Sequence, residues 1–370
     1  MTRRSNIIVL AAGGTGGHLF PAQALAEELV RRGYVVHLMT DERVKDYGKT
    51  FPAAEIHVIP SATMRLADPL RLPGRAWRLL TGYCAARKIL KRLQPGAVVG
   101  FGGYPSFPPI LAASRIGIPT CVHDQNAVMG RANKLLSKFA DVVASSFSNL
   151  TGLPDAARHK LVFTGNPVRD IALRESGANY GALTKDMPFN LLVFGGSQGA
   201  RFFAEFMPKV IAALDADVRT SLRLVQQCRP EDLDAVRALY GAHSFDFELQ
   251  SFFMDMPKRI AAAHLVICRS GASTIAELGV IGRPAIMVPL PHALDNDQLR
   301  NAESFAAAGA GWVRPQGELD AVEFAAFLMR LRYDDAALRK AAQAALTYGK
   351  PDAAQRLADL TEDLAGNSHR

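Results

Sequence analysis

The stretch that decides the fold is HLVICRSGASTIAE, residues His264–Glu277. The apolar run His264–Cys268 predicts a short buried strand. The small residues Ser270–Ser273 follow, and a helical pattern begins at Thr274. If this is an ordinary strand-to-helix turn, Ser270 is its N-cap. The first N–H groups of a helix lack an internal partner, and the helix dipole adds positive charge there. The stretch therefore predicts either an ordinary strand-to-helix turn or a phosphate site, with Glu277 near enough to bond a sugar hydroxyl.

Length and composition indicate about two folded domains. The chain has 370 residues, 49% of them hydrophobic, and a formal net charge of +8, which favours a partner that carries phosphates. Its 4 cysteines lack CxxC spacing, which indicates a reducing compartment and no disulfide or zinc framework. No apolar run reaches the roughly 18 residues of a membrane span. The short run Ile7–Ala12 is a weak signal peptide because Gly13 follows at once, so we expect a soluble or membrane-surface protein.

A strand, a Gly-rich loop and a helix open the chain. Asn6–Leu10 predicts the strand, Ala12–His18 the loop, Pro21–Arg32 the helix and Tyr34–Thr40 the next strand. Further strands are predicted at Ala97–Phe101, Pro119–His123 and Asp141–Ala144, with a helix over Pro109–Ile116. Strands that alternate with helices imply a parallel sheet covered on both faces.

The same order begins again in the second half of the chain. Asn190–Phe194 predicts a strand, and Gly195–Ala200 is a second Gly-rich loop that leads into a helix. Further strands are predicted at Leu222–Gln227, Phe245–Gln250, His264–Cys268 and Pro284–Pro289. Because ligands of open parallel sheets bind beyond the carboxyl ends of the strands, we expect both Gly loops and the Ser270 turn to face one interdomain cleft.

Glycine and proline residues mark the predicted domain limits. They cluster over Thr164–Asp186, where the strand pattern stops. We predict an N-terminal domain over 1–165, a linker over 166–186, a C-terminal domain over 187–348 and a final segment over 349–370. The last segment contains an amphipathic helix, Asp352–Leu364, which we expect to pack back on the N-terminal domain.

Motifs in a fixed order along the chain resemble those of a known family. They are GGTGGHLFPAQALAEEL from Gly13, FGGYPSFPP from Phe101, HDQNAVMGRANKLLS from His123, TGNPVR from Thr164, FGGSQGA from Phe194, CRSGASTIAELG from Cys268 and the segment ending in DQLRNA at Ala302. Together they resemble the bacterial glycosyltransferases that transfer N-acetylglucosamine from UDP-N-acetylglucosamine to lipid I, an undecaprenyl-diphosphate muramyl-pentapeptide. The resemblance implies a GT-B fold of two Rossmann-like, doubly wound parallel-sheet domains. It also implies inversion at the anomeric carbon, no metal or cofactor, and a role in peptidoglycan synthesis.

The resemblance also implies a set of donor-binding residues, mainly in the C-terminal domain. The helix start would take the diphosphate, and Glu277 the ribose hydroxyls. The other expected contacts are Ala272, Ser273, Thr274, Ile275 and Ala276 in that helix, Ser197 and Arg169 at the diphosphate, Phe253 at the uracil, Gln298 and Asn126 at the sugar, and Thr15, Gly16 and Gly17 from the other domain.

The implied attack of a muramyl 4-hydroxyl needs a general base, and His18 is the first candidate. Alternatively, His18 only positions the acceptor or fixes its loop. Asp124 is the second candidate, although the family commonly has the longer Glu there and Pro in place of Met129. The alternative for Asp124 is a carboxylate that orients Asn126 or His123.

Other polar residues are interpreted as structural. The histidines beside apolar runs are His37, His57, His264 and His292. The sequence Asp295-Asn296-Asp297 resembles the DxD of metal-dependent transferases, but no other ligands cluster near it in the sequence, so a polar loop or helix cap is favoured.

A basic stretch, Ser61–Arg92, carries 8 basic residues and 1 acidic residue. On a helix over Ala76–Leu93, one face holds Leu79, Tyr83, Ala86, Leu90 and Leu93, and the other holds Arg87, Lys88, Lys91 and Arg92 with Trp77, Leu80 and Cys84 among them. A mixed basic and apolar outer face favours contact with an anionic membrane over a merely solvated face. Because the resemblance implies a lipid acceptor, we expect a peripheral enzyme on the cytoplasmic face of the plasma (inner) membrane. The expected lipid contacts are Trp77, Leu80, Arg87, Lys88 and Lys91. We expect cell-wall synthesis proteins as further partners.

Three other functions fit parts of the sequence. A sugar-nucleotide epimerase shares the two-domain fold but leaves the basic helix unexplained. A serine hydrolase fits GxSxG at Gly195–Gly199, with Asp255 and His264 or His292 following in order, but leaves the duplicated architecture unexplained. A nucleic-acid-binding protein is suggested by net charge alone, without interleaved stacking aromatics, so we expect no nucleic-acid partner.

Overall fold

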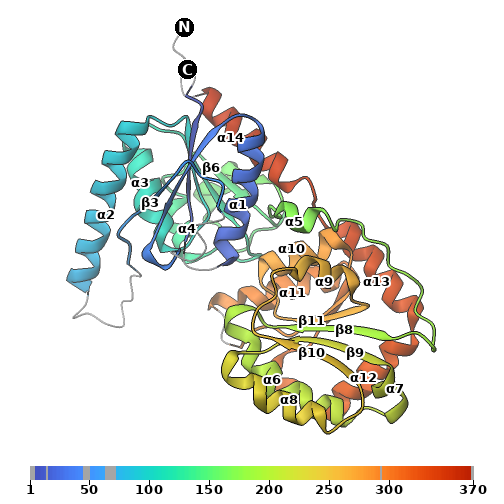
Figure 1. The fold of residues 1–370 in the computed structure, drawn as a ribbon. Helices are drawn as coiled ribbons and strands as arrows, with labels where there is room; N and C mark the ends of the chain where they lie inside the picture. Colours follow the sequence, from blue (N-terminus) through green and yellow to red (C-terminus); the bar gives the residue numbers. More distant parts are fainter. Residues whose placement is uncertain (1–4, 14–15, 45–50, 63–71, 292–293, 368–370) are drawn as a thin grey trace. The chain divides into compact units, whose positions relative to one another are not determined.

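The computed structural model describes residues 5–13, 16–44, 51–62, 72–291 and 294–367 (Figure 1). Thr15 and His292 lie outside these ranges. Contacts divide the chain into two compact units, one of residues 1–170 with 350–370 and one of residues 171–349. The first unit therefore includes the C-terminal helix, and the change between units falls within the segment 166–186.

The first unit is built on a parallel sheet in the order β3-β2-β1-β4-β5-β6-β7. The strands are β1 Ile7–Ala11, β2 Val35–Thr40, β3 Glu55–Val58, β4 Ala97–Gly100, β5 Thr120–Asp124, β6 Val142–Ser145 and β7 Leu161–Phe163. In β1 the side chains of Ile8 and Leu10 pack on one face and that of Val9 on the other, and all three are fully buried. Alternate side chains of a strand point to opposite faces of the sheet, and a sheet covered on both sides needs apolar side chains on both faces.

Helices cover both faces of this first sheet. The helices are α1 Gly16–Arg31, α2 Leu72–Leu93, α3 Phe107–Arg115, α4 Arg131–Leu136, α5 Asp170–Leu173 at the change of unit and α14 Ala353–Asn367, with short 3₁₀ turns at Glu42–Val44, Tyr104–Ser106 and Asp155–Lys160. α1 and α14 share a core with one face of the sheet, and α2, α3 and α4 share a core with the other. α14 runs beside α1, as the C-terminal helix of the chain returns to the first unit (Figure 1).

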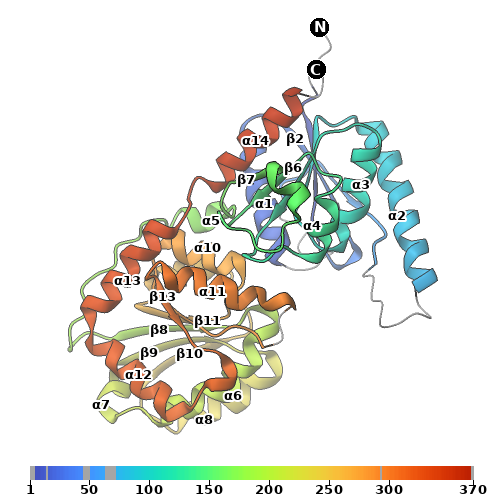
Figure 2. The same ribbon diagram turned by 180° about the vertical axis from the view of Figure 1, so that it is seen from behind.

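The second unit repeats the architecture, with a parallel sheet in the order β10-β9-β8-β11-β12-β13. Its strands are β8 Phe189–Phe194, β9 Leu222–Gln227, β10 Asp246–Gln250, β11 Leu265–Cys268, β12 Ala285–Met287 and β13 Gly311–Val313. Its helices are α6 Gly196–Ala212, α7 Ala216–Ser221, α8 Leu233–Gly241, α9 Met256–Ala262, α10 Ala272–Ile281, α11 Asp297–Ala307, α12 Ala321–Tyr333 and α13 Asp335–Tyr348, with 3₁₀ turns at Pro230–Asp232, Leu294–Asn296 and Gln316–Glu318. α6 and α8 lie on one face of the sheet, and α10 and α11 lie on the other (Figure 2). Two Rossmann-like parallel-sheet units are thus confirmed.

The differences from the predicted elements are local. The edge strands β3, β7 and β13 have no counterpart among the predicted strands, because each has only three or four residues. Helices α1, α3, α6 and α10 begin earlier than predicted. α1 begins at Gly16, so His18 lies on its first turn and not in the preceding loop. α10 begins at Ala272 and not at Thr274.

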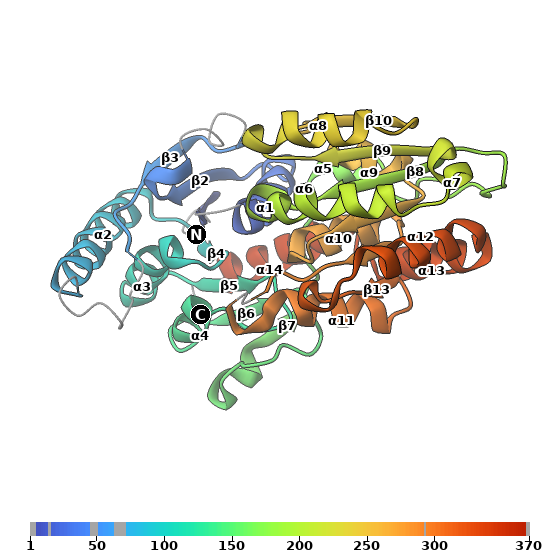
Figure 3. The same ribbon diagram turned by 90° about the horizontal axis from the view of Figure 1, so that it is seen from below.

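Helix α2 lies beside α3 on the outer side of the first unit (Figures 1 and 3). Ala86 and Leu90 are fully buried, whereas Trp77 and Leu80 are 66% and 52% exposed, so the two predicted faces are confirmed. Gly82 lies where the helix crosses the chain after β3, and a Cβ there would stand 2.0 Å from the Pro60 carbonyl oxygen. The close approach explains a glycine in the middle of this helix. None of the described helices combines the length and the apolar character that crossing a bilayer requires.

We predict that Gly82→Ala lowers the free energy of unfolding by about 1–3 kcal/mol, because the methyl group cannot be accommodated without moving α2 away from Pro60. Urea denaturation measures the change. Gly74→Ala is the matched control on the same helix, since a Cβ there meets nothing within 4 Å. Equal stability of the two variants would contradict this account of the packing.

Candidate functional sites of the two units

In the second unit, two helices begin at adjacent strands. β8 and β11 pair in parallel, with Phe194 opposite Cys268 at their carboxyl ends. α6 begins at Gly196 with one intervening residue after β8, and α10 begins at Ala272 with three intervening residues after β11. Both helix N-termini therefore lie at the same edge of the sheet, where their unpaired N–H groups favour an anion.

The turn before α10 differs from the predicted one. Gly271 is the N-cap, without a side-chain cap, and the Ser270 side chain is not used for capping. Instead, the Ser270 hydroxyl donates to the Gln298 carbonyl at 2.7 Å, and Asn301 Nδ2 donates to the Ser270 carbonyl at 3.1 Å. Ser270 therefore ties this turn to α11 and leaves the first N–H groups of α10 for another acceptor.

The start of α10 combines free backbone donors with an unpaired hydroxyl. Ser273 Oγ is buried and has no hydrogen-bond partner among the described residues. The predicted contacts Ala272, Thr274, Ile275 and Ala276 lie in the same first two turns, and Glu277 follows them with 8% of its surface exposed. A buried hydroxyl without a partner costs free energy unless a ligand or water satisfies it. The arrangement suits a diphosphate at the helix end.

The residue that sequence reasoning missed here is Arg269. Its side chain is buried, and Nη1 donates to the carbonyls of Val288 and Pro289 at 3.0 Å each. Nη2 donates to Gln316 Oε1 at 2.6 Å, and the guanidinium lies over the rings of Phe202 and Phe203. Burial lowers the pKa of Arg269 to about 10, which leaves it charged at neutral pH. Its position directly before the Ser-Gly turn was the available signal, and its role is to hold this turn against the end of β12.

Two further predicted donor contacts lie in this unit. Phe253 is buried shortly after β10, with the Arg259 guanidinium 4.2 Å above its ring. Gln298 is on α11, and its Oε1 accepts a hydrogen bond from the Leu290 N–H at 3.0 Å. Ser197 lies on α6, and its side chain is outside the described part of the structure.

In the first unit, His18 is held by a chain of hydrogen bonds. His18 Nδ1 lies 2.9 Å from Gln125 Oε1, and Gln125 Nε2 lies 3.0 Å from His123 Nδ1. His123 Nε2 lies 3.0 Å from the Gly165 carbonyl oxygen. The His18 ring also packs against Gly103, where a Cβ would stand 3.4 Å from Nε2. β1 and β4 pair with Ala11 opposite Gly100, which brings the loops after these strands together.

The proton positions in this series of hydrogen bonds follow from the Gly165 carbonyl oxygen, which can only accept a hydrogen bond. His123 must therefore donate through Nε2. Burial lowers the pKa of His123 to about 4, so its ring is neutral at pH 7 and its Nδ1 accepts from Gln125 Nε2. Gln125 then presents Oε1 to His18, and His18 must donate through Nδ1. In the neutral imidazole, Nε2 then carries the lone pair that a general base needs.

Asp124 occupies a different environment. Its Oδ2 accepts from the Gly130 N–H at 2.9 Å and from Asn133 Nδ2 at 3.0 Å, and its Oδ1 accepts from the Asn126 N–H at 3.2 Å. Only 2% of the residue is exposed. Burial raises the pKa of Asp124, while these three donors act in the opposite direction. The geometry favours a carboxylate that fixes the loop between β5 and α4, including the predicted sugar contact Asn126.

The remaining predicted contacts of the first unit lie around α1. Gly16 and Gly17 form its first turn. The Arg169 guanidinium lies 3.8 Å above the ring of Phe20, which is on the same helix. Asn166, which the sequence analysis did not single out, is buried with neither amide atom paired among the described residues. Its place in TGNPVR was the available signal.

The described residues do not bring His264 or Asp255 into a hydrolase site with Ser197, and His292 lies outside the described ranges. His264 precedes β11 and accepts from the Asn190 N–H at 2.9 Å, so it lies at the amino end of the strands, whereas Ser197 follows their carboxyl end. Asp255 pairs with Arg259 at 2.8 Å. Asp295, Asn296 and Asp297 lie at the 3₁₀ turn and the first residue of α11.

Comparisons with known proteins agree with this architecture. A protein of Rhizobium meliloti (strain 1021), named UDP-N-acetylglucosamine--N-acetylmuramyl-(pentapeptide) pyrophosphoryl-undecaprenol N-acetylglucosamine transferase, is 51% identical over 365 residues, which cover 98% of this chain and 96% of that protein. Models of the glycosyltransferase family 28 N-terminal and C-terminal domains match residues 8–145 and 190–357. The chain belongs to glycosyltransferase family 28.

Solved structures place this family 28 glycosyltransferase in the GT-B fold. The crystal structure of Acinetobacter baumannii MurG matches with a TM-score of 0.75 and 31% identity, over 96% of this chain and 99% of that one. CalG4, the calicheamicin glycosyltransferase, matches with a TM-score of 0.69 at 19% identity over 100% of both chains, which shows the fold alone. The family and the fold expected from the sequence motifs are confirmed.

The buried His123 of this family 28 glycosyltransferase predicts a pH-dependent stability. Because its pKa is lowered from 6.5 to about 4 by burial, the unfolded state binds more protons between these values, and stability falls as pH falls through this window. We expect the wild type to lose about 2 kcal/mol from this group between pH 7.5 and pH 5. His123→Gln should lose correspondingly less in urea denaturation, whereas His159→Gln, at an exposed position, should match the wild type. Identical pH dependence of wild type and His123→Gln would contradict the assignment.

Proposed function

We propose that this glycosyltransferase transfers N-acetylglucosamine from UDP-N-acetylglucosamine to the muramyl 4-hydroxyl of lipid I, with inversion and without a metal ion, and so makes lipid II. The observation that carries the proposal is the 51% identity, over nearly the full length of both chains, to a relative named for this transfer. The His18 geometry and the paired helix N-termini of the second unit support it.

In this reaction the first unit, over about 1–165 and with the returning helix, would bind the acceptor and supply the base. The acceptor oxygen forms a bond to the anomeric carbon, and its proton passes to His18 Nε2, the nitrogen left with a lone pair by Gln125. Gln125, His123 and the Gly165 carbonyl would act through His18, as positioning residues. Asp124 would act through the loop that carries Asn126.

The second unit, over about 187–348, would hold the donor. The bond from the anomeric carbon to the diphosphate oxygen breaks, and UDP leaves with the electron pair. The developing charge needs donors fixed in advance. The N-termini of α6 and α10 and the Ser273 hydroxyl would supply such donors. Arg169 is a further proposed diphosphate contact, and we assign Glu277 to the ribose, Phe253 to the uracil and Gln298 to the sugar.

We predict that purified protein releases UDP from UDP-N-acetylglucosamine only when a lipid I analogue is present. His18→Ala should lower kcat by about 10²-fold or more, since a positioned base contributes this much, and should leave donor binding in calorimetry unchanged. UDP release without acceptor, or formation of the epimeric sugar nucleotide, would contradict the transferase.

Substitutions of Gln125 test separately whether the hydrogen bonds that orient His18 matter for the reaction. Gln125→Met removes the acceptor for His18 Nδ1 and should lower kcat about 10-fold or more with the donor KM unchanged. Gln125→Glu keeps an acceptor at this place and should retain more of kcat than Gln125→Met. If both variants turned over like the wild type, the fixed orientation of His18 would not matter for the reaction.

We further propose that α2 holds the enzyme on an anionic membrane, on the cytoplasmic side where UDP-sugars are found. Trp77 and Leu80 project from the exposed face of the helix, and Arg87, Lys88 and Lys91 continue the same face at helical spacing. Apolar anchors together with cations are the features of an interfacial helix. Partners among cell-wall synthesis proteins remain an expectation from the family.

We predict that the wild type co-sediments with vesicles that contain anionic lipid and is released by salt, because screening weakens the basic contacts. The double variant Trp77→Ser/Leu80→Ser should bind such vesicles about 10-fold more weakly or worse. Val322→Ser, which removes an equally exposed apolar side chain from the second unit, is the control. Binding that ignores both lipid charge and the double substitution would contradict this role of α2.

A further inference from the structure

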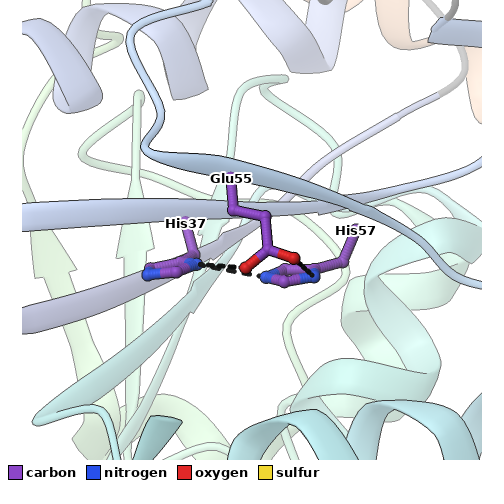
Figure 4. A group of neighbouring side chains, drawn as sticks. All are labelled: His37, Glu55 and His57. Atoms are coloured by element: carbon purple, nitrogen blue, oxygen red, sulfur yellow. Dashed lines mark hydrogen bonds and ion pairs between the residues drawn. The ribbon is translucent and has the colours of Figure 1, made fainter.

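Two histidines and a glutamate meet on one face of the first sheet, at its β3 edge (Figure 4). His37 on β2 lies directly opposite Glu55 on β3, and His57 is two residues further along β3. Side chains two apart on a strand share a face, so the three side chains project together. None of them belongs to the site around His18.

The nitrogen atoms are already close to the spacing of metal ligands. His37 Nδ1 lies 3.1 Å from His57 Nε2, and two nitrogens on a tetrahedral Zn²⁺ lie roughly 3.3 Å apart. Glu55 Oε2 lies 3.9 Å from His37 Nδ1. The ligand atoms of all three residues lie within 4.8 Å of one another. The glutamate is exposed, so a small movement of its carboxylate completes a three-ligand set.

The tautomers can adapt to an ion without loss of a proton. Glu55 Oε1 lies 3.4 Å from His57 Nδ1 and favours the proton there, which leaves a lone pair on His57 Nε2. In the ion-free protein His37 Nδ1 then donates to that lone pair. When an ion binds, the His37 proton moves to Nε2 and Nδ1 becomes a ligand.

The charges around the cluster also suit a cation. The Glu55 carboxylate lies 3.9 Å from His37 Nδ1 and 3.4 Å from His57 Nδ1, so the cluster pairs two imidazoles with one negative charge. Arg92, at the end of α2, lies with Nη2 3.5 Å from Glu55 Oε2 and competes for the carboxylate. Both side chains of this pair are more than half exposed, so the pair is weak and easily opened.

We propose that His37, His57 and Glu55 form a binding site for a divalent transition-metal ion of the Zn²⁺ type, with a fourth position open to water. Two imidazoles and one carboxylate select such an ion over Mg²⁺ or Ca²⁺. The ion would join the four-residue edge strand β3 to β2. It would have no part in sugar transfer.

Untagged, chelator-treated full-length protein, titrated with Zn²⁺ by calorimetry at pH 7.5, tests the proposal. We expect one ion per chain that His37, His57 and Glu55 bind together, so His57→Ala or Glu55→Gln should weaken binding at least 10-fold. Co²⁺ should give the absorption spectrum of a tetrahedral site, and this spectrum should be lost in His57→Ala. His159→Ala, at an exposed histidine of the same unit, is the matched control and should bind like the wild type.

Arg92→Gln separates the proposal from a simple loss of folding, because it removes a competing cation and leaves all three ligands in place. This variant should bind Zn²⁺ more tightly than the wild type, and Zn²⁺ should raise its melting temperature more. Zn²⁺ binding that is unchanged in His57→Ala and Glu55→Gln, or that weakens in Arg92→Gln, would overturn the proposal.

Discussion

Both candidate sites depend on one constraint, the parallel pairing of the central strands of each sheet. β1 with β4, and β8 with β11, end at the same level, because their register places Ala11 opposite Gly100 and Phe194 opposite Cys268. The loops that follow adjacent strands must therefore meet at one edge. The side chains and helix N-termini that a sugar-nucleotide reaction uses are brought together by this pairing and by little else in the local sequence.

Within the first unit, a single carbonyl group determines which nitrogen of each linked histidine carries a proton. The Gly165 oxygen cannot donate, and this fixes the protons on His123, Gln125 and His18 in turn. The hydrogen bonds run from the residue Gly165 after β7 to the first turn of α1, so the fold itself sets the tautomer of the proposed base. Asp124, although adjacent to His123 in sequence, points its oxygens at the Asn126, Gly130 and Asn133 donors and stabilises a loop.

Much of the architecture could be predicted from sequence, because buried strands such as β9 are continuous apolar or alternating runs between turn residues. The edge strand β3 could not, since its pairing is decided by β2 and not by its own short sequence. For the sites, glycine loops and the motif order identified His18 and the start of α10. The contacts of Ser270 and Arg269 were not predictable, because the atoms they bond to lie 19 or more residues away along the chain. The role of Gln125 depends in the same way on a carbonyl beyond the next two strands.

The most direct test of this account is the tautomer of His18, measured by ¹H–¹⁵N correlation spectra of ¹⁵N-histidine-labelled protein at pH 8, with the His18 signal assigned from the spectrum of His18→Ala. The account predicts a proton on Nδ1 and an unprotonated Nε2, together with the opposite tautomer for His123. A proton on Nε2 of His18 would contradict it, because that nitrogen could then not accept the proton of the acceptor hydroxyl.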